Sequence, residues 1–215
     1  MYRGVIGTES HILGINCIAL AGGKGLRLGR DKLIENIGDR SVLERVVSCL
    51  SLFDSDIIVV RSAKQSVSGF IDYPKLRVVA DFYPEKGPLG GIYTGLTASD
   101  SFYNIVVACD MPFLNQALLR YMVQLSADYD LVVPRLGNMV EPLHAVYSKD
   151  CIEPIEDLLK QGILGVTELF TIVKVRYVEA GEIDRFDPEH RSFFNINTES
   201  DVRTARALVK ERKEL

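Results

Sequence analysis

The stretch "IALAGGKGLRLGRDKL", residues 18–33, begins as an apolar run and then breaks into four glycines, several basic residues and an Asp-Lys pair. Glycine exposes backbone N–H groups, and arginine and lysine bind anionic oxygens. This composition therefore favours a phosphate-binding loop that follows a buried strand. The alternative is a glycine-rich turn whose basic side chains are only solvated.

The spacing of the glycines excludes two common phosphate-binding motifs. The Walker motif requires Ser or Thr after a Gly-Lys pair, and Gly25 follows Lys24 here. The dinucleotide-binding pattern G-x-G-x-x-G fails because Leu28 stands where the third glycine belongs. What remains is a loop in which Arg27 and Lys32 can meet a polyphosphate, the first as a planar fork and the second as a point charge.

Apolar runs recur along the chain and alternate with helical patterns. The runs rich in Val and Ile cover residues 16–21, 56–61, 76–81, 104–110 and 130–134. Short continuous runs of this kind are typical of strands covered on both faces, hence of a largely parallel sheet. The helical patterns, each opening on a suitable N-cap, cover residues 41–52, 115–125 and 198–215.

The predicted fold class is therefore α/β: a doubly wound, mostly parallel sheet in a three-layer α/β/α arrangement. Two further apolar runs, 143–147 and 174–179, are expected to be added or antiparallel strands. We expect a single domain over residues 15–215, preceded by an N-terminal extension, 1–14, to which no role can be assigned.

Composition and charge exclude several classes of partner. The 215 residues carry a net charge of −4, which argues against a nucleic-acid surface. No run reaches the roughly 18 apolar residues of a membrane span, and residues 1–14 lack a signal-peptide core, so the expected location is the cytoplasm. The cysteines are too scattered for a metal site or a disulfide framework, and they are expected to be small buried hydrophobes: Cys17, Cys49, Cys109 and Cys151.

Ligands of open α/β sheets bind beyond the carboxyl ends of the strands, so the residues that follow each apolar run are candidates for the site. Asp110, in "VVACDMPF", can be a helix cap or a ligand of a hard cation. Opposite a basic glycine loop, it is placed to hold Mg²⁺, which uses one or two carboxylates plus substrate phosphates. Asp81 ends another run, and a helix predicted from Gly87 carries Gly90 and Gly91, which leave room either for a nucleoside or for close packing on the sheet.

Taken together, these motifs resemble the molybdenum cofactor guanylyltransferases, the nucleotidyltransferase family of molybdopterin-guanine dinucleotide biosynthesis protein A, which joins GMP to molybdopterin. The resemblance covers nearly the whole chain after about residue 15 and rests on five segments in order: "LAGGKGLRLGRDK", "GPLGG", "CDMPF", "EPLHAVY" and "FFNINTESD". Sugar nucleotidyltransferases place a longer insertion between the loop arginine and the phosphate lysine. The cytidylyltransferase of the same pathway usually reads Ala-Ala-Gly and lacks "GPLGG", so the guanine branch is favoured.

The resemblance implies a role for each matching residue. Lys32 would bind the phosphates, Asp110 would hold Mg²⁺ or Mn²⁺, and Arg27 would join them in catalysis. The implied nucleotide-binding residues are Leu20, Ala21, Gly22, Gly23, Lys32, Asp81 and Asp110. The implied acceptor-binding residues are Asn195, Asn197 and His144.

Two positions in this comparison have competing interpretations. His144 lies within the apolar "LHAVY", so it also fits a core histidine. Some family members carry an Asn after the second strand, where this chain has Val60 followed by Arg61. That departure means either that the chain aligns differently at this position or that one base or ribose contact is absent.

The implied reaction is attack of a pterin phosphate on the α-phosphorus of GTP, with pyrophosphate as the leaving group. No general base is needed, because the second pKa of a phosphate monoester is about 6. Two alternatives stay open: transfer of a cytidylyl or other nucleotidyl group to a different phosphorylated acceptor, and a non-catalytic GTP-binding adaptor. The presence of both Asp110 and Lys32 favours the enzyme. The expected partners are GTP and molybdopterin, with a molybdoenzyme or chaperone for delivery, no nucleic acid or membrane, and at most weak oligomerisation of the monomer.

Overall fold

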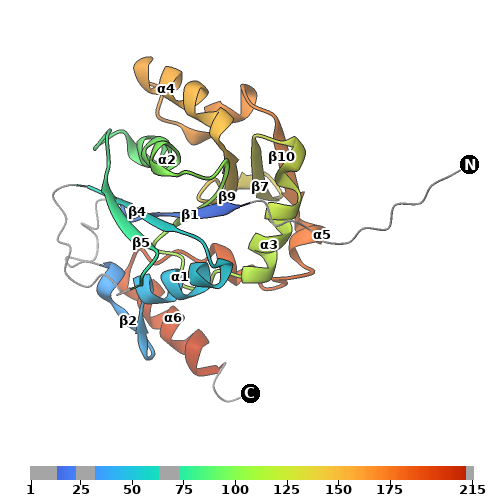
Figure 1. The fold of residues 1–215 in the computed structure, drawn as a ribbon. Coiled ribbons are helices and arrows are strands. Elements are labelled where there is room, and N and C mark those ends of the chain that lie inside the picture. Colours follow the sequence, from blue (N-terminus) through green and yellow to red (C-terminus); the bar gives the residue numbers. More distant parts are fainter. Residues whose placement is uncertain (1–13, 23–31, 63–72, 212–215) are drawn as a thin grey trace, which may run out of the picture.

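The computed structural model describes residues 14–22, 32–62 and 73–211 (Figure 1). Seven strands lie side by side in one sheet, and a short eighth pairs with one of them. Their order is β5 (Leu76–Ala80), β4 (Ile57–Arg61), β1 (Ile15–Leu20), β6 (Tyr103–Ala108), β9 (His144–Ser148), β7 (Leu131–Leu136) and β10 (Val175–Glu179), with β8 (Met139–Val140) on β7.

The sheet is mostly parallel, as predicted. β1 pairs in parallel with β4 and β6. β4 also pairs in parallel with β5, and β7 pairs in parallel with β10. β9 is antiparallel to both of its neighbours, β6 and β7. The two expected late strands therefore differ: β9 is an antiparallel strand inserted between two strands that run parallel to each other, and β10 is a parallel strand at the edge of the sheet.

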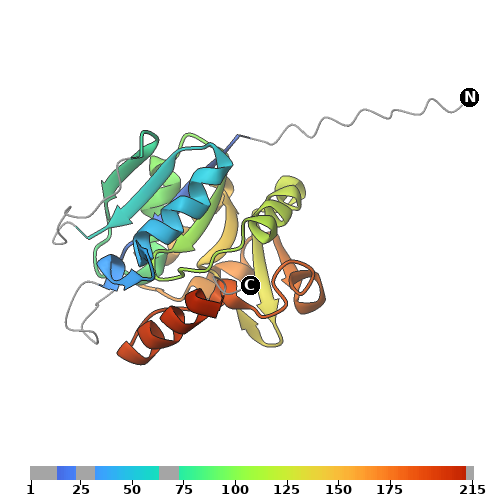
Figure 2. The same cartoon turned by 90° about the horizontal axis from the view of Figure 1, so that it is seen from below.

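Helices cover both faces of this sheet, which explains why its strands are continuously apolar. One face packs against α1 (Val42–Leu50) and α3 (Gln116–Gln124), with α6 (Glu199–Glu211) beside them on the same side (Figure 2). The other face packs against α2 (Gly87–Ala98) and α4 (Ile152–Lys160) (Figure 1). A short α5 (Ala180–Ile183) follows β10. These layers confirm the predicted doubly wound α/β class.

The predicted helix starts are confirmed in detail. Ser41 and Glu44 form the capping box of α1: the Glu44 N–H donates to Ser41 Oγ at 3.2 Å, and the Glu44 carboxylate accepts from the Ser41 N–H. Asn115 Oδ1 accepts from the Leu118 N–H at 3.0 Å at the start of α3. Thr198 Oγ1 accepts from the N–H of Asp201 in the first turn of α6 at 3.2 Å.

Three short strands and two helices were not predicted, the second of these helices being α5. The hairpin of β2 (Asn36–Ile37) and β3 (Arg40–Ser41), like β8, has only two residues per strand and so no readable alternation. The first of the two helices is α4, which buries Ile155, Leu158 and Leu159 at helical spacing.

The cysteines have the character expected of them. None is in a disulfide, three are buried and Cys49 is half-buried. Burial raises the pKa of Cys17 and of Cys151 to about 12, so both thiols stay protonated and inert at neutral pH. In the part of the chain that the structure describes, no helix is long and apolar enough to cross a membrane.

Candidate functional site

The carboxyl edge of the sheet has its switch point between β1 and β6. From β1 the chain continues to β4 on one side, whereas β6 lies on the other side, so the loops that leave β1 and β6 diverge. Ala21 and Gly22 follow β1, and Cys109 and Asp110 follow β6. The Cys109 N–H donates to the carbonyl oxygen of Leu20 at 3.0 Å, which holds the two strand ends together.

Asp110 is half-buried at this switch point, and the segment that carries Asn195 and Asn197 lies against it. The N–H of Ile196 donates to the carbonyl oxygen of Asp110 at 2.9 Å. The ring of Phe113 packs on that of Phe194 with centroids 5.8 Å apart, which fastens the same two segments a second time. The fold therefore unites two motifs that lie far apart in the sequence.

The N–H groups of residues 197 and 198 are held by the first turn of α6. The Asn197 N–H donates to Asp201 Oδ2 at 2.9 Å, and the Thr198 N–H donates to the same oxygen at 2.7 Å. Asn195 is half-buried and donates from Nδ2 to the carbonyl oxygen of Phe193 at 3.1 Å. Asn197 is exposed. The "NINT" segment is thus fixed at both ends.

Asp81 lies at the carboxyl end of β5, two strands from β1. Its N–H donates to the carbonyl oxygen of Arg61 at 2.8 Å, which ties it to the end of β4. Its Oδ1 accepts from the Tyr83 N–H and from the Thr94 hydroxyl, both at 3.0 Å. This carboxylate orders the turn that leads into α2.

The glycines of α2 are explained in part by close packing. A Cβ on Gly90 would lie 2.9 Å from the carbonyl oxygen of Tyr83, and a Cβ on Gly95 would overlap the side chain of Ile18. Gly91 faces Leu20 at ordinary contact distance. The packing interpretation therefore accounts for Gly90, which allows α2 to lie close to Tyr83, and for Gly95, which allows α2 to lie close to Ile18 in β1.

His144 begins β9, which brings it to the same edge of the sheet, but it is fully buried. Its ring meets that of Phe193 edge to face, with centroids 5.0 Å apart. Neither ring nitrogen has a hydrogen-bond partner among the described residues. Burial lowers the pKa of His144 to about 4, opposed by the negative charge of Asp187, so the imidazole is neutral at pH 7.

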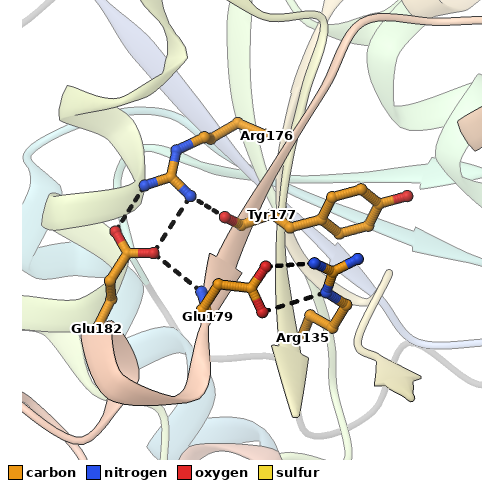
Figure 3. A network of polar contacts seen from close by, with 5 residues as sticks. All are labelled: Arg135, Arg176, Tyr177, Glu179 and Glu182. Atoms are coloured by element: carbon orange, nitrogen blue, oxygen red, sulfur yellow. Dashed lines mark hydrogen bonds and ion pairs between the residues drawn. The ribbon is translucent and has the colours of Figure 1, made fainter. Parts of the chain in front are cut away.

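A polar cluster occupies the far end of the edge, where β7 and β10 finish (Figure 3). Arg135 and Glu179 are cross-strand neighbours and form a two-point ion pair, with Arg135 Nε 3.2 Å from Glu179 Oε2. The Arg135 guanidinium also lies over the ring of Tyr177, 4.2 Å from its centroid. A second pair, Arg176 and Glu182, lies beside it (Figure 3).

Comparison with known proteins supplies the family. The model of the MobA-like NTP transferase domain matches residues 17–174. The chain belongs to this family. The probable molybdenum cofactor guanylyltransferase of Pelotomaculum thermopropionicum is 35% identical over 89% of this chain and 92% of its own length. A protein of the same description from Methanosarcina mazei is 36% identical over 92% of each chain.

A solved structure agrees with these matches. The crystal structure of molybdopterin-guanine dinucleotide biosynthesis protein A from Archaeoglobus fulgidus superimposes on this MobA-like NTP transferase with a TM-score of 0.79 and 25% identity. It covers 91% of this chain and 99% of the other. The resemblance deduced from five motifs therefore extends over nearly the entire fold, and the family is a family of nucleotidyltransferases.

The edge of this MobA-like NTP transferase gathers most of the predicted site residues. Leu20 and Ala21 are buried, Gly22 is exposed, and a Cβ on Gly22 would contact no atom of the described residues within 4 Å. Lys32 starts the short helical turn Lys32–Ile34, and its side chain is outside the described part. Gly23 and Arg27, which the sequence predicts to be nucleotide-binding and catalytic, lie outside the described residues.

Val60 and Arg61 occupy the position at which this chain departs from some members of the family. Val60 is buried in β4 and stands in register with Leu20 of β1, so it belongs to the core. Arg61, the last residue of β4, adjoins Asp81 at the carboxyl edge. Neither Arg61 nor Arg135 was among the predicted site residues, although each lies at the end of an apolar run, as Asp110 does.

The donor atoms of this edge suit a hard cation shared with a substrate. Among the described residues, no group of three or more His, Cys, Asp or Glu side chains forms a complete metal site. Nucleotidyltransferases generally use a divalent metal, and Mg²⁺ needs only one or two carboxylates when substrate phosphates supply further oxygens. A single carboxylate at the switch point, Asp110, fits that requirement.

Proposed function

We propose that this MobA-like NTP transferase transfers GMP from GTP to the phosphate of molybdopterin, forming molybdopterin guanine dinucleotide and releasing pyrophosphate. The observation that carries the proposal is the contact between Asp110 and the "NINT" segment, through the 2.9 Å hydrogen bond from the Ile196 N–H. It joins a carboxylate suited to a phosphate-bound cation to the segment that the family resemblance connects with the pterin. The descriptions of the relatives, which match over nine-tenths of their length, support the same reaction.

The donor side of the proposed site is the end of β1. Leu20, Ala21 and Gly22, with Gly23, would surround the guanine nucleotide. Backbone N–H groups and a small exposed residue allow a base or phosphate to approach closely. Asp81 would lie near the nucleoside, and its hydrogen bonds to Tyr83 and Thr94 fix its orientation.

The phosphates of GTP would lie between that loop and Asp110. Lys32 and Arg27 would bind them, because a lysine supplies a mobile point charge and an arginine supplies a planar pair of donors. Asp110 would hold Mg²⁺, or Mn²⁺ in its place, and the cation would neutralise the charge that develops on pyrophosphate. The residues thus act by positioning two anions and by electrostatics.

The acceptor side would begin at Asn195 and Asn197, whose segment is clamped between Asp110 and α6. His144 is fully buried behind Phe193, so we propose that it supports this wall from the core and that a direct contact with the acceptor would require Phe193 to move. The acceptor phosphate is already largely ionised at neutral pH, so no residue has to remove a proton from it.

The setting of the reaction follows from the same features. Four cysteines that form no disulfide suit a reducing compartment, and we propose the cytoplasm as the location of the protein. We also propose that residues 15–215 act as one domain behind the extension 1–14. A molybdoenzyme or a chaperone would receive the product.

The test is pyrophosphate release by the full chain in Mg²⁺, with GTP, CTP, ATP or UTP, in the presence and absence of molybdopterin. Release from GTP that depends on molybdopterin is expected. Release of pyrophosphate from CTP instead would show that the protein transfers a cytidylyl group. Binding of GTP without release of pyrophosphate under any condition would indicate a non-catalytic adaptor.

A further inference from the structure

The pair formed by Arg135 and Glu179 has an unusual combination of contacts for an exposed ion pair. The central carbon of its planar guanidinium lies over the ring of Tyr177, 4.2 Å from the ring centroid, and the guanidinium presents two N–H donors to the two oxygens of Glu179 (Figure 3). The side chains are 39% and 50% exposed, so water and solutes reach them. A half-exposed ion pair adds little net stability, so a ligand can displace it at low cost.

A 2-amino-4-oxopyrimidine ring would reproduce both contacts of this guanidinium. The ring N–H and the 2-amino group are two parallel donors, which a carboxylate accepts in the same two-point geometry as it accepts an arginine. The flat ring can stack on a tyrosine as the guanidinium does. In this respect the Arg135 side chain occupies the place of such a heterocycle.

We propose that Tyr177 and Glu179 form a binding platform for the 2-amino-4-oxopyrimidine edge of the pterin acceptor, and that Arg135 fills the platform until the acceptor displaces it. This inference rests on the proposed function, whose acceptor carries such an edge. On binding, Glu179 exchanges the two N–H donors of Arg135 for those of the ring, and the guanidinium moves into solvent at the end of β7.

The place of the platform in the sheet suits an elongated acceptor. β10 lies three strands from β6, across β9 and β7, which is about 14 Å at the usual spacing between strands. Tyr177 and Glu179 lie on the opposite side of Asp110 from the end of β1, and β10 forms the edge of the sheet there. A pterin that spans this distance would present its phosphate near Asp110 and its pyrimidine edge at Glu179.

The adjacent pair, Arg176 and Glu182, supplies a matched control. Its side chains are 27% and 23% exposed, and its carboxylate also accepts from the Tyr121 hydroxyl at 2.5 Å and from the Glu179 N–H at 3.0 Å. This pair joins β10 to α3 and α5, so it fastens the edge of the fold. We expect substitutions here to lower stability without changing the affinity for a pterin.

Guanine carries the same amino-oxo edge as a pterin, so the base of GTP is a second source of this chemistry. The experiment must therefore separate a heterocycle of the acceptor from the base of the donor. The probe is 6-hydroxymethylpterin, which has no phosphate and whose fluorescence reports binding to the full-length protein. The control ligands are 6-hydroxymethyllumazine, which has oxygen in place of the 2-amino group, and guanosine.

The proposal predicts opposite effects of breaking the same ion pair from its two ends. Glu179→Gln should weaken the pterin by about tenfold or more, whereas Arg135→Gln should leave it as tight or tighter because it removes the competitor. Tyr177→Leu should weaken it by a similar factor, and Tyr177→Phe should retain it, since the stacking surface is kept. Arg176→Gln should not change it, and the lumazine should bind poorly to every variant.

The following results would overturn the platform. One is that the wild type fails to bind the pterin. Another is that Glu179→Gln and Arg135→Gln change the affinity for the pterin in the same direction. A third is that the pterin and the lumazine bind with equal affinity. Displacement of the pterin by guanosine at similar concentration, with GTP binding lost in Glu179→Gln, would assign the platform to the donor instead. Transfer from GTP to molybdopterin by the wild type is measured separately. If it occurs with an unchanged acceptor KM in Glu179→Gln, the platform fails and the proposed function stands, whereas no transfer at all rejects the proposed function by itself.

Discussion

The carbonyl oxygen of Asp110 accepts a hydrogen bond from the N–H of Ile196 at 2.9 Å. This bond joins the turn after β6 to the segment before α6, and the packing of Phe113 on Phe194 strengthens the same junction. A carboxylate at the switch point and the two asparagines of "NINT" consequently share one wall.

Asp110→Ala should reduce turnover at least about a hundredfold while the protein stays folded, because a half-buried carboxylate at the end of a strand would be lost as cation ligand without a cavity in the core. Pyrophosphate release in Mg²⁺ and thermal unfolding measure the two effects. Asp128→Ala, on an exposed turn, is the matched control. Retained turnover in Asp110→Ala would contradict the proposed cation site.

Lys32→Ala should weaken GTP and slow the chemical step together, because the lysine would bind phosphates both in the ground state and as charge develops on the leaving pyrophosphate. GTP titration and single-turnover rates separate the two effects. Lys149→Ala, next to the amino end of the sheet at the close of β9, provides a comparison with the same loss of charge. Normal GTP affinity and a normal rate in Lys32→Ala would show that Lys32 has no part in the site.

Gly95→Ala should destabilise the protein by about 1–3 kcal/mol, because the added Cβ overlaps Ile18 and pushes α2 away from β1. Denaturant unfolding measures the loss. Gly181→Ala is the control, since a Cβ at that helical position meets nothing within 4 Å and alanine favours a helix. Equal stability of the two variants would mean that α2 does not pack as closely as the structure indicates.

The stability of the protein should fall as the pH drops from about 6.5 to about 4, in part because of His144. Burial lowers the pKa of His144 in the folded state to about 4. Between these pH values, His144 is therefore protonated in the unfolded chain and neutral in the folded chain. The free energy of unfolding therefore rises with pH across this window, and the contribution of His144 reaches its full value above about pH 6.5. The shift corresponds to roughly 3 kcal/mol at most.

The measurement is the free energy of unfolding against pH for the wild type, His144→Gln and His190→Gln. His190 is partly exposed and pairs with Asp184, so it serves as the control. The slope should flatten only in His144→Gln. An unchanged slope in that variant would show that His144 is not a buried neutral imidazole.

The central sheet and part of the candidate site could be predicted from the sequence, because the relevant signals are local. A continuous Val-rich run indicates a covered strand, and the residue after it lies at the ligand-binding edge, which found Asp81 and Asp110. The capping residues Ser41 and Asn115 were readable for the same reason, since each cap involves only the next three residues.

The remaining features depend on contacts between distant segments. The pairing of Arg135 with Glu179 requires β10 to lie beside β7, and no local pattern fixes that neighbour. The insertion of β9 between β6 and β7, which buries His144, is equally non-local. No local pattern predicts the contact between Ile196 and Asp110. Only the family resemblance placed their two motifs in one site.

The most direct measurement is to incubate the full chain with Mg²⁺, molybdopterin and GTP labelled at the α-phosphate, and to identify the labelled product by mass. The account predicts label in molybdopterin guanine dinucleotide, formed together with one pyrophosphate, and none in the reaction of Asp110→Ala. Label that stays in GTP, or that enters another acceptor while molybdopterin is untouched, would contradict it.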